Sequence, residues 1–272
     1  MKLLKRKLKR IWLLNFFRRI YFATKYFNYK YIQILKWGIN SKQDTNFTYD
    51  ITEENVMYLA FLVSLVTNKD YKTIIDYINE AKNDIELKNQ IIKQIKNSPL
   101  GKFEDNKIYY GRRLGWYAFV RAMKPKVVVE TGIDKGLGSV LLCSALLRNK
   151  EEGYDGRYYG TDINPEAGYL LSGKYKNVGE ILFGDSIKSL STFKNKIDLF
   201  INDSDHSFDY EYQEYLTIKP LITEHTIILG DNAHCTNKLA LFSSETNRKF
   251  LFFKEEPLNH WYPGAGIGIS FN

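Results

Sequence analysis

The chain has little cysteine, and it has no apolar run long enough to cross a bilayer. Its two cysteines, Cys143 and Cys235, stand far apart and in no metal-ligand spacing. This argues against a disulfide framework and for free thiols in a reducing compartment. A membrane-spanning helix needs about 20 consecutive apolar residues, whereas the apolar run at 11–17 ends at Arg18 and Arg19. No small-residue cleavage site comes after that run, so it is also a poor signal-peptide core. We therefore expect a cytoplasmic protein.

Acidic residues are absent from the first 43 positions, which carry 12 lysines and arginines. Since the net charge is +8, the +12 of this segment leaves −4 for residues 44–272. A nucleic-acid enzyme usually spreads basic residues over its working face, so no nucleic-acid partner is expected. Bulky apolar residues recur among the basic ones at spacings of three and four, which predicts a basic amphipathic helix over 1–43. Such a helix suits an anionic membrane surface at the inner membrane, and packing on a partner protein is the alternative.

Three regions are predicted along the chain. Residues 1–43 form the basic helix, 44–110 a helical lead-in or cap, and 111–272 a domain in which strands and helices alternate. Thr52 is the predicted N-cap of the first lead-in helix. The lead-in could form a contact in a homo-oligomer or a lid over a pocket, and the pattern does not choose between them.

Seven apolar runs of the third region are predicted strands: 127–129, 157–161, 180–183, 199–201, 226–229, 250–253 and 266–271. Helices are predicted between them, one of them over Glu166–Gly173, but none between the last two strands. This alternation predicts an α/β fold with a Rossmann-like, doubly wound, mostly parallel seven-stranded sheet and an antiparallel hairpin at one edge.

Acids and a histidine come directly after two of these strands. Asp203, Asp205 and His206 come after the strand at 199–201, and Asp231 and Asn232 come after the next one. The carboxyl ends of parallel strands meet at one edge of the sheet, where ligands bind. Carboxylate and amide oxygens suit a hard divalent cation such as Mg²⁺, and a histidine with an ordinary pKa of about 6.5 suits a general base. Helix caps and turns are the structural alternative for the same side chains.

A glycine-rich loop lies between the first strand and its helix. Gly132 and Gly136 allow a sharp turn and a close approach of the backbone to a ligand. The spacing is not the GxGxxG of dinucleotide binders. Glu130 comes directly before the loop, and its negative charge would repel a pyrophosphate. It favours a positively charged or amine-bearing ligand instead.

Two further strand ends carry groups that suit a nucleoside. Asp162 ends the second strand, where an acid commonly holds ribose hydroxyls. Asp185 and Ser186 come after the third strand, where a polar side chain could meet an adenine amino group. Each acid taken alone is equally well explained as a helix N-cap, and the series in order is what favours a ligand.

The region from about residue 111 to 271 resembles the class I S-adenosylmethionine-dependent methyltransferases. The resemblance rests on the sequence VVVETG at 127–132, on Asp162, on Gly184-Asp185-Ser186 and on the two closing strands. The segment 116–121 before Pro125 also resembles the lead-in of bacterial sugar and natural-product O-methyltransferases. The first 100 residues lie outside the resemblance.

The resemblance implies a role for each candidate residue. On the cofactor side, the methionine part of S-adenosylmethionine would contact Glu130, Gly132 and Gly136. Its ribose would contact Asp162, and its adenine would contact Asp185 and Ser186. Metal-dependent members carry an Asp after the fourth strand and an Asp-Asn pair after the fifth, which implies a divalent cation at Asp203, Asp231 and Asn232. A catalytic Lys or His three residues after the first ligand implies His206 as the base. Asp205 would orient His206 or touch the substrate, and it is the alternative to the favoured Asp203 as a metal ligand.

The expected function is therefore O-methyl transfer to a hydroxyl of a sugar, a glycan precursor or a specialised metabolite. A nicotinamide-dependent oxidoreductase and a noncatalytic membrane-recruited module are the two alternatives on the same fold.

Overall fold

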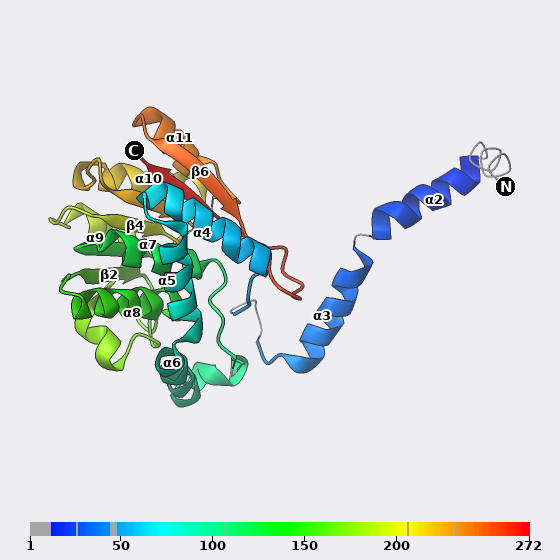
Figure 1. The fold of residues 1–272 in the computed structure, drawn as a ribbon, viewed down its shortest axis with the longest axis horizontal. Helices are drawn as coiled ribbons and strands as arrows, with labels where there is room; N and C mark the ends of the chain where they lie inside the picture. Colours follow the sequence, from blue (N-terminus) through cyan, green and yellow to red (C-terminus); the bar gives the residue numbers. More distant parts are fainter. Residues whose placement is uncertain (1–11, 26, 44–47, 106, 206, 232) are drawn as a thin grey trace.

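The computed structural model describes residues 12–25, 27–43, 48–105, 107–205, 207–231 and 233–272. Its centre is a seven-stranded sheet with the strand order β3-β2-β1-β4-β5-β7-β6 (Figure 1). All pairs are parallel except those of β7, which runs antiparallel to both β5 and β6. The strands are β1 (Val127–Thr131), β2 (Arg157–Asp162), β3 (Gly179–Phe183), β4 (Leu199–Asn202), β5 (Ile227–Gly230), β6 (Lys249–Lys254) and β7 (Gly266–Phe271). The predicted fold class and the antiparallel edge are confirmed.

Helices cover both faces of the sheet. The lead-in contributes α4 (Glu53–Thr67), α5 (Tyr71–Asn83), α6 (Ile85–Asn97) and the 3-10 helix η1 (Pro99–Phe103). The domain itself contributes α7 (Arg113–Met123), α8 (Leu137–Glu151), η2 (Gly173–Val178), α9 (Ser186–Ser191), α10 (Phe208–Ile218), η3 (Lys219–Leu221) and α11 (Lys238–Glu245).

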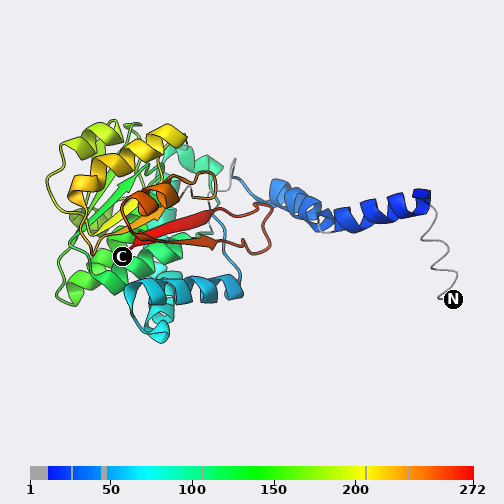
Figure 2. The same cartoon turned by 90° about the horizontal axis from the view of Figure 1, so that it is seen from above.

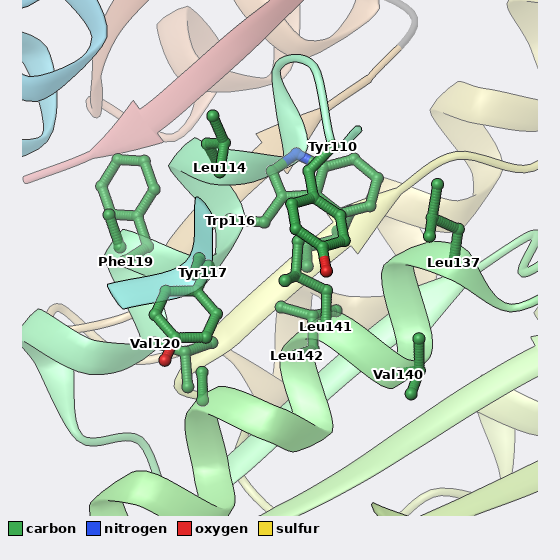
Figure 3. Packing of buried hydrophobic residues seen from close by; sticks show 14 of the residues in the cluster. Tyr110, Leu114, Trp116, Tyr117, Phe119, Val120, Leu137, Val140, Leu141 and Leu142 are labelled. Atoms are coloured by element: carbon green, nitrogen blue, oxygen red, sulfur yellow. The ribbon is translucent and has the colours of Figure 1, made fainter. Parts of the chain in front are cut away.

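The core has two parts, one on each face of the sheet. The larger part includes buried side chains of α4, α5 and α6 together with those of α7, α8 and the sheet. Figure 3 shows part of this cluster, in which side chains of α7 such as Trp116 and Phe119 are drawn with Leu141 and Leu142 of α8. The smaller part joins β4 and β5 to α10 and α11, with Phe200, Tyr215 and Phe242 at its centre. The lead-in thus packs as an outer layer on the domain and shares its core.

Local signals set the position of the lead-in. The Thr52 side chain accepts a hydrogen bond of 3.2 Å from the amide of Asn55, which confirms Thr52 as the N-cap of α4. The Asn55 side chain in turn donates to the carbonyl of Lys254 at 3.0 Å and accepts from the amide of Glu256 at 2.9 Å. The first turn of α4 is therefore fixed to the end of β6, close to the carboxyl edge of the sheet.

One predicted helix is wrong. Residues 166–173 form turns that lead into η2. Gly168 has a φ of +75°, and a Cβ there would lie 2.4 Å from Cδ1 of Ile181. The left-handed backbone ends any helix at this position, and it brings the segment against β3.

The basic N-terminus forms an arm that projects from the domain (Figures 1 and 2). It consists of two helices where one was predicted, α2 (Trp12–Lys25) and α3 (Asn28–Asn40), while residues 1–11 lie outside the described part. Lys30 Nζ donates to the carbonyl of His260 at 3.3 Å, and the rings of Trp37 and Trp261 meet with centroids 5.3 Å apart. These contacts fix α3 to the β6–β7 connection at 255–265. Among the described residues, no helix has the length and apolar content of a membrane span.

Candidate active site

A cavity of about 530 Å³ opens at the carboxyl ends of β1, β2, β3 and β4. Its walls bring together six of the residues predicted from the sequence: Gly132, Asp162, Asp185, Ser186, Asp203 and Asp205. The other lining residues are Asp134, Thr161, Ile163, Asn164, Gly184, Ser204 and Tyr210. The volume is that of a site for a small organic molecule. Two predicted residues, Glu130 and Gly136, are buried and do not line the cavity.

The glycine loop after β1 is built for close backbone contacts. Gly132 has a φ of +75°, and its amide donates to the carbonyl of Thr161 at 2.9 Å. A Cβ at this position would lie 2.1 Å from the carbonyl oxygen of Asp203, so only glycine fits. Gly136 has a φ of +89°, and its hypothetical Cβ would lie 2.9 Å from Cα of Gly168. The loop thus passes between the ends of β2 and β4.

Asp162 holds the floor of the cavity through backbone amides. One carboxylate oxygen accepts from the amide of Asp134 at 3.0 Å, and the other accepts from the amide of Asn164 at 2.8 Å. Each oxygen retains a second lone pair, and the side chain is only partly buried. Asp162 can therefore accept two further hydrogen bonds from a diol such as a ribose.

Asp185 caps α9, as its structural alternative predicted. Its carboxylate accepts from the amide of Lys188 at 2.7 Å and from the hydroxyl of Tyr210 at 2.9 Å. The neighbouring Ser186 is buried and bonded to Tyr210 and Glu214. Asp185 remains exposed at the rim of the cavity, so that capping and ligand binding are compatible.

Glu130 is buried beneath the glycine loop. Its carboxyl group accepts hydrogen bonds from the hydroxyl of Tyr158 and, at 3.1 Å, from Ser139. Burial raises the pKa of Glu130 to about 7, against the lowering effect of those two donors. The predicted contact of Glu130 with the methionine part of a cofactor stays a prediction, because the side chain points into the packing between β1, β2 and α8.

Glu214 of α10 joins the strand ends that form the cavity, and it was not among the residues predicted from the sequence. It accepts hydrogen bonds from Ser204 at 2.6 Å and from Ser186 and Asn202, and Thr131 lies within 3.4 Å. Burial raises its pKa to about 6. One signal was available: Glu214 is three residues beyond Glu211, on the face of α10 that also buries Tyr215 and Ile218.

The acceptor side of the site contains a pair of adjacent carboxyl groups. Asp203 comes after β4 and Asp231 comes after β5, and their side chains are within hydrogen-bonding contact. Burial and the neighbouring Asp231 raise the pKa of Asp203 well above its usual value. Burial alone would also raise the pKa of Asp231, but the guanidinium of Arg112 outweighs it and lowers that pKa. The two side chains are thus close to one another, as residues at the ends of the neighbouring strands β4 and β5.

Arg112 and Glu255 complete this cluster, and neither was predicted from the sequence. Arg112 binds Asp231 with two nitrogens, Nε at 2.6 Å from one oxygen and a terminal nitrogen on the other. Its remaining terminal nitrogen donates to Glu255 at 3.0 Å and to the hydroxyl of Tyr49 at 2.6 Å. The guanidinium of Arg113 lies 3.8 Å from Asp203. The pair Arg112-Arg113 before a helix gave no hint of these partners.

The predicted cation site can be tested only in part. His206 and Asn232 lie outside the described residues, and no group of three metal-ligating acids, histidines or cysteines occurs in the described part of the chain. Both oxygens of Asp231 accept hydrogen bonds from Arg112, whose positive charge opposes a cation at the same carboxylate. In this arrangement Asp231 does not fit a cation.

Two other histidines have structural partners. His234 Nδ1 lies 3.2 Å from the carbonyl oxygen of Asp231, and burial lowers its pKa. The His260 ring packs on Tyr49 with centroids 5.6 Å apart, at the base of the N-terminal arm.

Comparisons with known proteins agree with this geometry. A family model described as a methyltransferase domain matches residues 129–233, which carry the cavity. An O-methyltransferase from Bacillus cereus, in complex with S-adenosylhomocysteine, is 12% identical with a TM-score of 0.52, over 71% of this chain and 94% of that chain. A provisionally assigned O-methyltransferase from Klebsiella pneumoniae is 13% identical with a TM-score of 0.51, over 68% and 89% of the two chains. No curated protein sequence matches this chain.

These findings show the shared fold and a similarity at the level of the domain, and they do not test membership of the metal-dependent subgroup. The Rossmann-like fold is shared with these O-methyltransferase structures. Residues 129–233 are similar to a methyltransferase domain, which agrees with the predicted enzyme class of S-adenosylmethionine-dependent methyltransferases.

Proposed function

We propose that the protein is an S-adenosylmethionine-dependent O-methyltransferase that acts on a small hydroxyl-bearing molecule. One observation carries the proposal: five aspartates and no lysine or arginine are found among the described residues that line the cavity. S-adenosylmethionine carries a sulfonium and an ammonium group, which negative walls attract. The same walls repel the pyrophosphate of a nicotinamide dinucleotide, so the oxidoreductase alternative is not favoured.

We propose a place for each part of the cofactor among the lining residues. Asp162 would accept the ribose hydroxyls, while Asp185 and Ser186 would face the adenine. The backbone of the loop at 132–136 would lie along the methionine part. When bound, S-adenosylmethionine supplies a methyl group on a sulfonium, which is already activated toward a nucleophile. A cavity lined by these polar and acidic residues also disfavours a noncatalytic module, because such a module would not need a cofactor site.

The chain must supply what the acceptor hydroxyl needs, which is the loss of its proton. His206 is the proposed base, because it comes three residues after Asp203 in the sequence, directly after Asp205, which lines the cavity. Asp205 lines the cavity and accepts from the amide of Ser207 at 2.7 Å, so it helps to shape this loop. Arg112 and Arg113 place positive charge beside the carboxyl pair. A divalent cation at Asp203, Asp231 and Asn232 stays a prediction, and it requires Arg112 to release Asp231.

For the acceptor we propose a sugar, a glycan precursor or a specialised metabolite, on the strength of the sequence resemblance. We place the enzyme in the cytosol, near the inner membrane. An exposed free thiol at Cys235 suits a reducing compartment.

Calorimetric titration with S-adenosylhomocysteine and with NAD tests the cofactor. We expect S-adenosylhomocysteine to bind and NAD not to bind. Replacing Asp162 by Ala removes two charge-assisted hydrogen bonds to the ribose, so the Kd should rise at least about tenfold. Asp155→Ala is the matched control, because that aspartate is 83% exposed and lies just before β2. The proposal is contradicted if NAD binds and S-adenosylhomocysteine does not. It is also contradicted if Asp162→Ala and the unaltered protein have equal Kd values for S-adenosylhomocysteine.

The proton and the cation are tested separately, by turnover. His206→Ala should lower kcat by about 10²-fold or more if His206 is the base, and an unchanged rate removes it. Turnover that persists after EDTA treatment removes the cation and leaves the methyl transfer intact. Restoration of activity by Mg²⁺ after EDTA supports the cation.

A further inference from the structure

The exposed apolar face of α2 is broad and continuous. None of its described residues is buried. Trp12, Phe16 and Ile20 lie one above the other at a spacing of four, and they are 69, 43 and 49% exposed. Leu13, Phe17 and Tyr21 extend the same face at 54, 60 and 62% exposure. Arg18 and Lys25 lie on the other side of the helix, together with Leu14 and Phe22, whereas Arg19 lies at the edge of the apolar face, beside Trp12 and Phe16.

The orientation of α3 is the reverse of that of an ordinary surface helix. Lys30, Gln33 and Trp37 share the face that meets the domain, where Lys30 donates to the carbonyl of His260 and Trp37 packs on Trp261. The opposite face carries Tyr31, Leu35 and Ile39 at a spacing of four, with 67, 65 and 81% of each residue exposed. A helix of a soluble domain normally turns its apolar face to the core and its polar face to water.

Packing within the chain therefore does not account for these faces. The arm projects from the domain, so that the apolar sides of α2 and α3 meet no other described element (Figures 1 and 2). Exposed apolar surface on this scale marks an interaction site.

The charge of the arm indicates what kind of partner binds to these apolar faces. The described arm residues, 12–25 and 27–43, include six lysines and arginines and no acid. A one-sided helix with Trp and Phe on its apolar side and Lys and Arg on its polar side is suited to lie in the headgroup region of a membrane. Each basic residue near an anionic surface contributes about fivefold to binding. A protein partner would need a complementary acidic surface around the apolar face.

We propose that α2 and α3 bind an anionic lipid surface through the faces that include Trp12, Phe16, Leu35 and Ile39. The contact of α3 with the β6–β7 connection, through Lys30 and Trp37, then fixes the catalytic domain to that surface. His260 of this connection packs on Tyr49, whose hydroxyl donates to Glu255 at 2.7 Å, and Glu255 binds Arg112 beside Asp231. The arm is thus attached next to the acceptor side of the site. This proposal stands independently of the methyl-transfer chemistry.

Sedimentation of the full-length protein with vesicles tests the arm. Neutral vesicles of phosphatidylcholine are compared with vesicles that contain about 30 mol% phosphatidylglycerol. We expect binding to the anionic vesicles, and the Arg18→Gln/Arg19→Gln variant should lose about 25-fold in partition, from two factors of about fivefold. The Leu35→Ser/Ile39→Ser variant should lose at least about tenfold, because the apolar face no longer inserts.

A matched control lies on the domain. Leu65 of α4 is 69% exposed, close to the 65% of Leu35, and Leu65→Ser should leave vesicle binding unchanged. Equal partition of the α3 double variant and of the unaltered protein overturns the proposal. So does a concentration-dependent dimer, measured by sedimentation equilibrium, that the α3 substitutions dissociate, because a second copy would then be the occupant. Titration with S-adenosylhomocysteine reports on the folding of each variant and on the cofactor site, so failure of one proposal is distinguished from failure of the other.

Discussion

Replacing Glu130 by Gln should change how the stability of the protein depends on pH. Glu130 is 1% exposed, and its pKa is raised from 4.5 to about 7 by burial. An unfolded glutamate releases its proton near pH 4.5, whereas the native one keeps it up to about pH 7. Between these values the native state binds more protons than the unfolded state. The free energy of unfolding therefore falls as the pH rises through this interval.

The size of the effect is set by the two pKa values. Each pH unit in the interval removes about 1.4 kcal/mol, so the unaltered protein loses about 3 kcal/mol between pH 4.5 and pH 7 on account of Glu130. Glutamine resembles the protonated glutamate in shape, and its carbonyl oxygen can accept from Tyr158 and Ser139. Glu130→Gln should match the unaltered protein near about pH 5 and exceed it by up to about 3 kcal/mol at about pH 8.

Urea unfolding followed by circular dichroism, at several values between about pH 5 and about pH 8, measures the difference. Glu180→Gln on β3 is the control, because that side chain is 48% exposed and its replacement alters no buried charge. A constant difference between Glu130→Gln and the unaltered protein over the whole range refutes the reasoning. It would mean that Glu130 ionises in the native state much as it does in the unfolded chain.

Four further substitutions test the site. Gly132→Ala should raise the Kd for S-adenosylhomocysteine at least about tenfold by calorimetry, since a Cβ forces the Asp203 backbone away, and unchanged affinity contradicts the close approach. Arg112→Ala leaves the carboxylates of Asp231 and Glu255 buried without the guanidinium that pairs with them. Urea unfolding should therefore show that the free energy of unfolding falls by about 3–5 kcal/mol. Arg113→Ala should lose much less, because its guanidinium only approaches Asp203 at 3.8 Å, and equal losses would argue against the Arg112 network. Glu214→Ala should cost about 3 kcal/mol or more, because the donors that bind it lose their acceptor, and a loss below about 1 kcal/mol contradicts its role.

Much of the fold was predictable because its strands are short, apolar and regularly separated by helices. The strand at 266–271 was predicted to the residue, and the others differ by one or two residues at their ends. The helix predicted over 166–173 failed for a local reason, since Gly168 has a left-handed backbone that the apolar pattern does not reveal. The single basic helix predicted over 1–43 is divided into α2 and α3 within its described part.

Four of the candidate acids lie close together because each of them stands at or directly after the end of a strand. The carboxyl ends of neighbouring parallel strands must meet, so chain order alone places Asp162, Asp185 and Asp203 around one cavity and Asp231 beside it. The roles of His206 and Asn232 stay predictions, because both lie outside the described residues.

The sequence by itself determined the class of sheet, the edge at which ligands bind and the acidic character of that edge. These properties depend on the period of apolar residues and on the side chains at the end of each strand, both of which are local. Only the tertiary structure decided which charges meet. Arg112 is 119 residues from Asp231 and 143 from Glu255, and no local pattern records such a contact. The same holds for α3, whose sequence shows an apolar and a polar face, while its packing on the β6–β7 connection decides that the apolar face points outward.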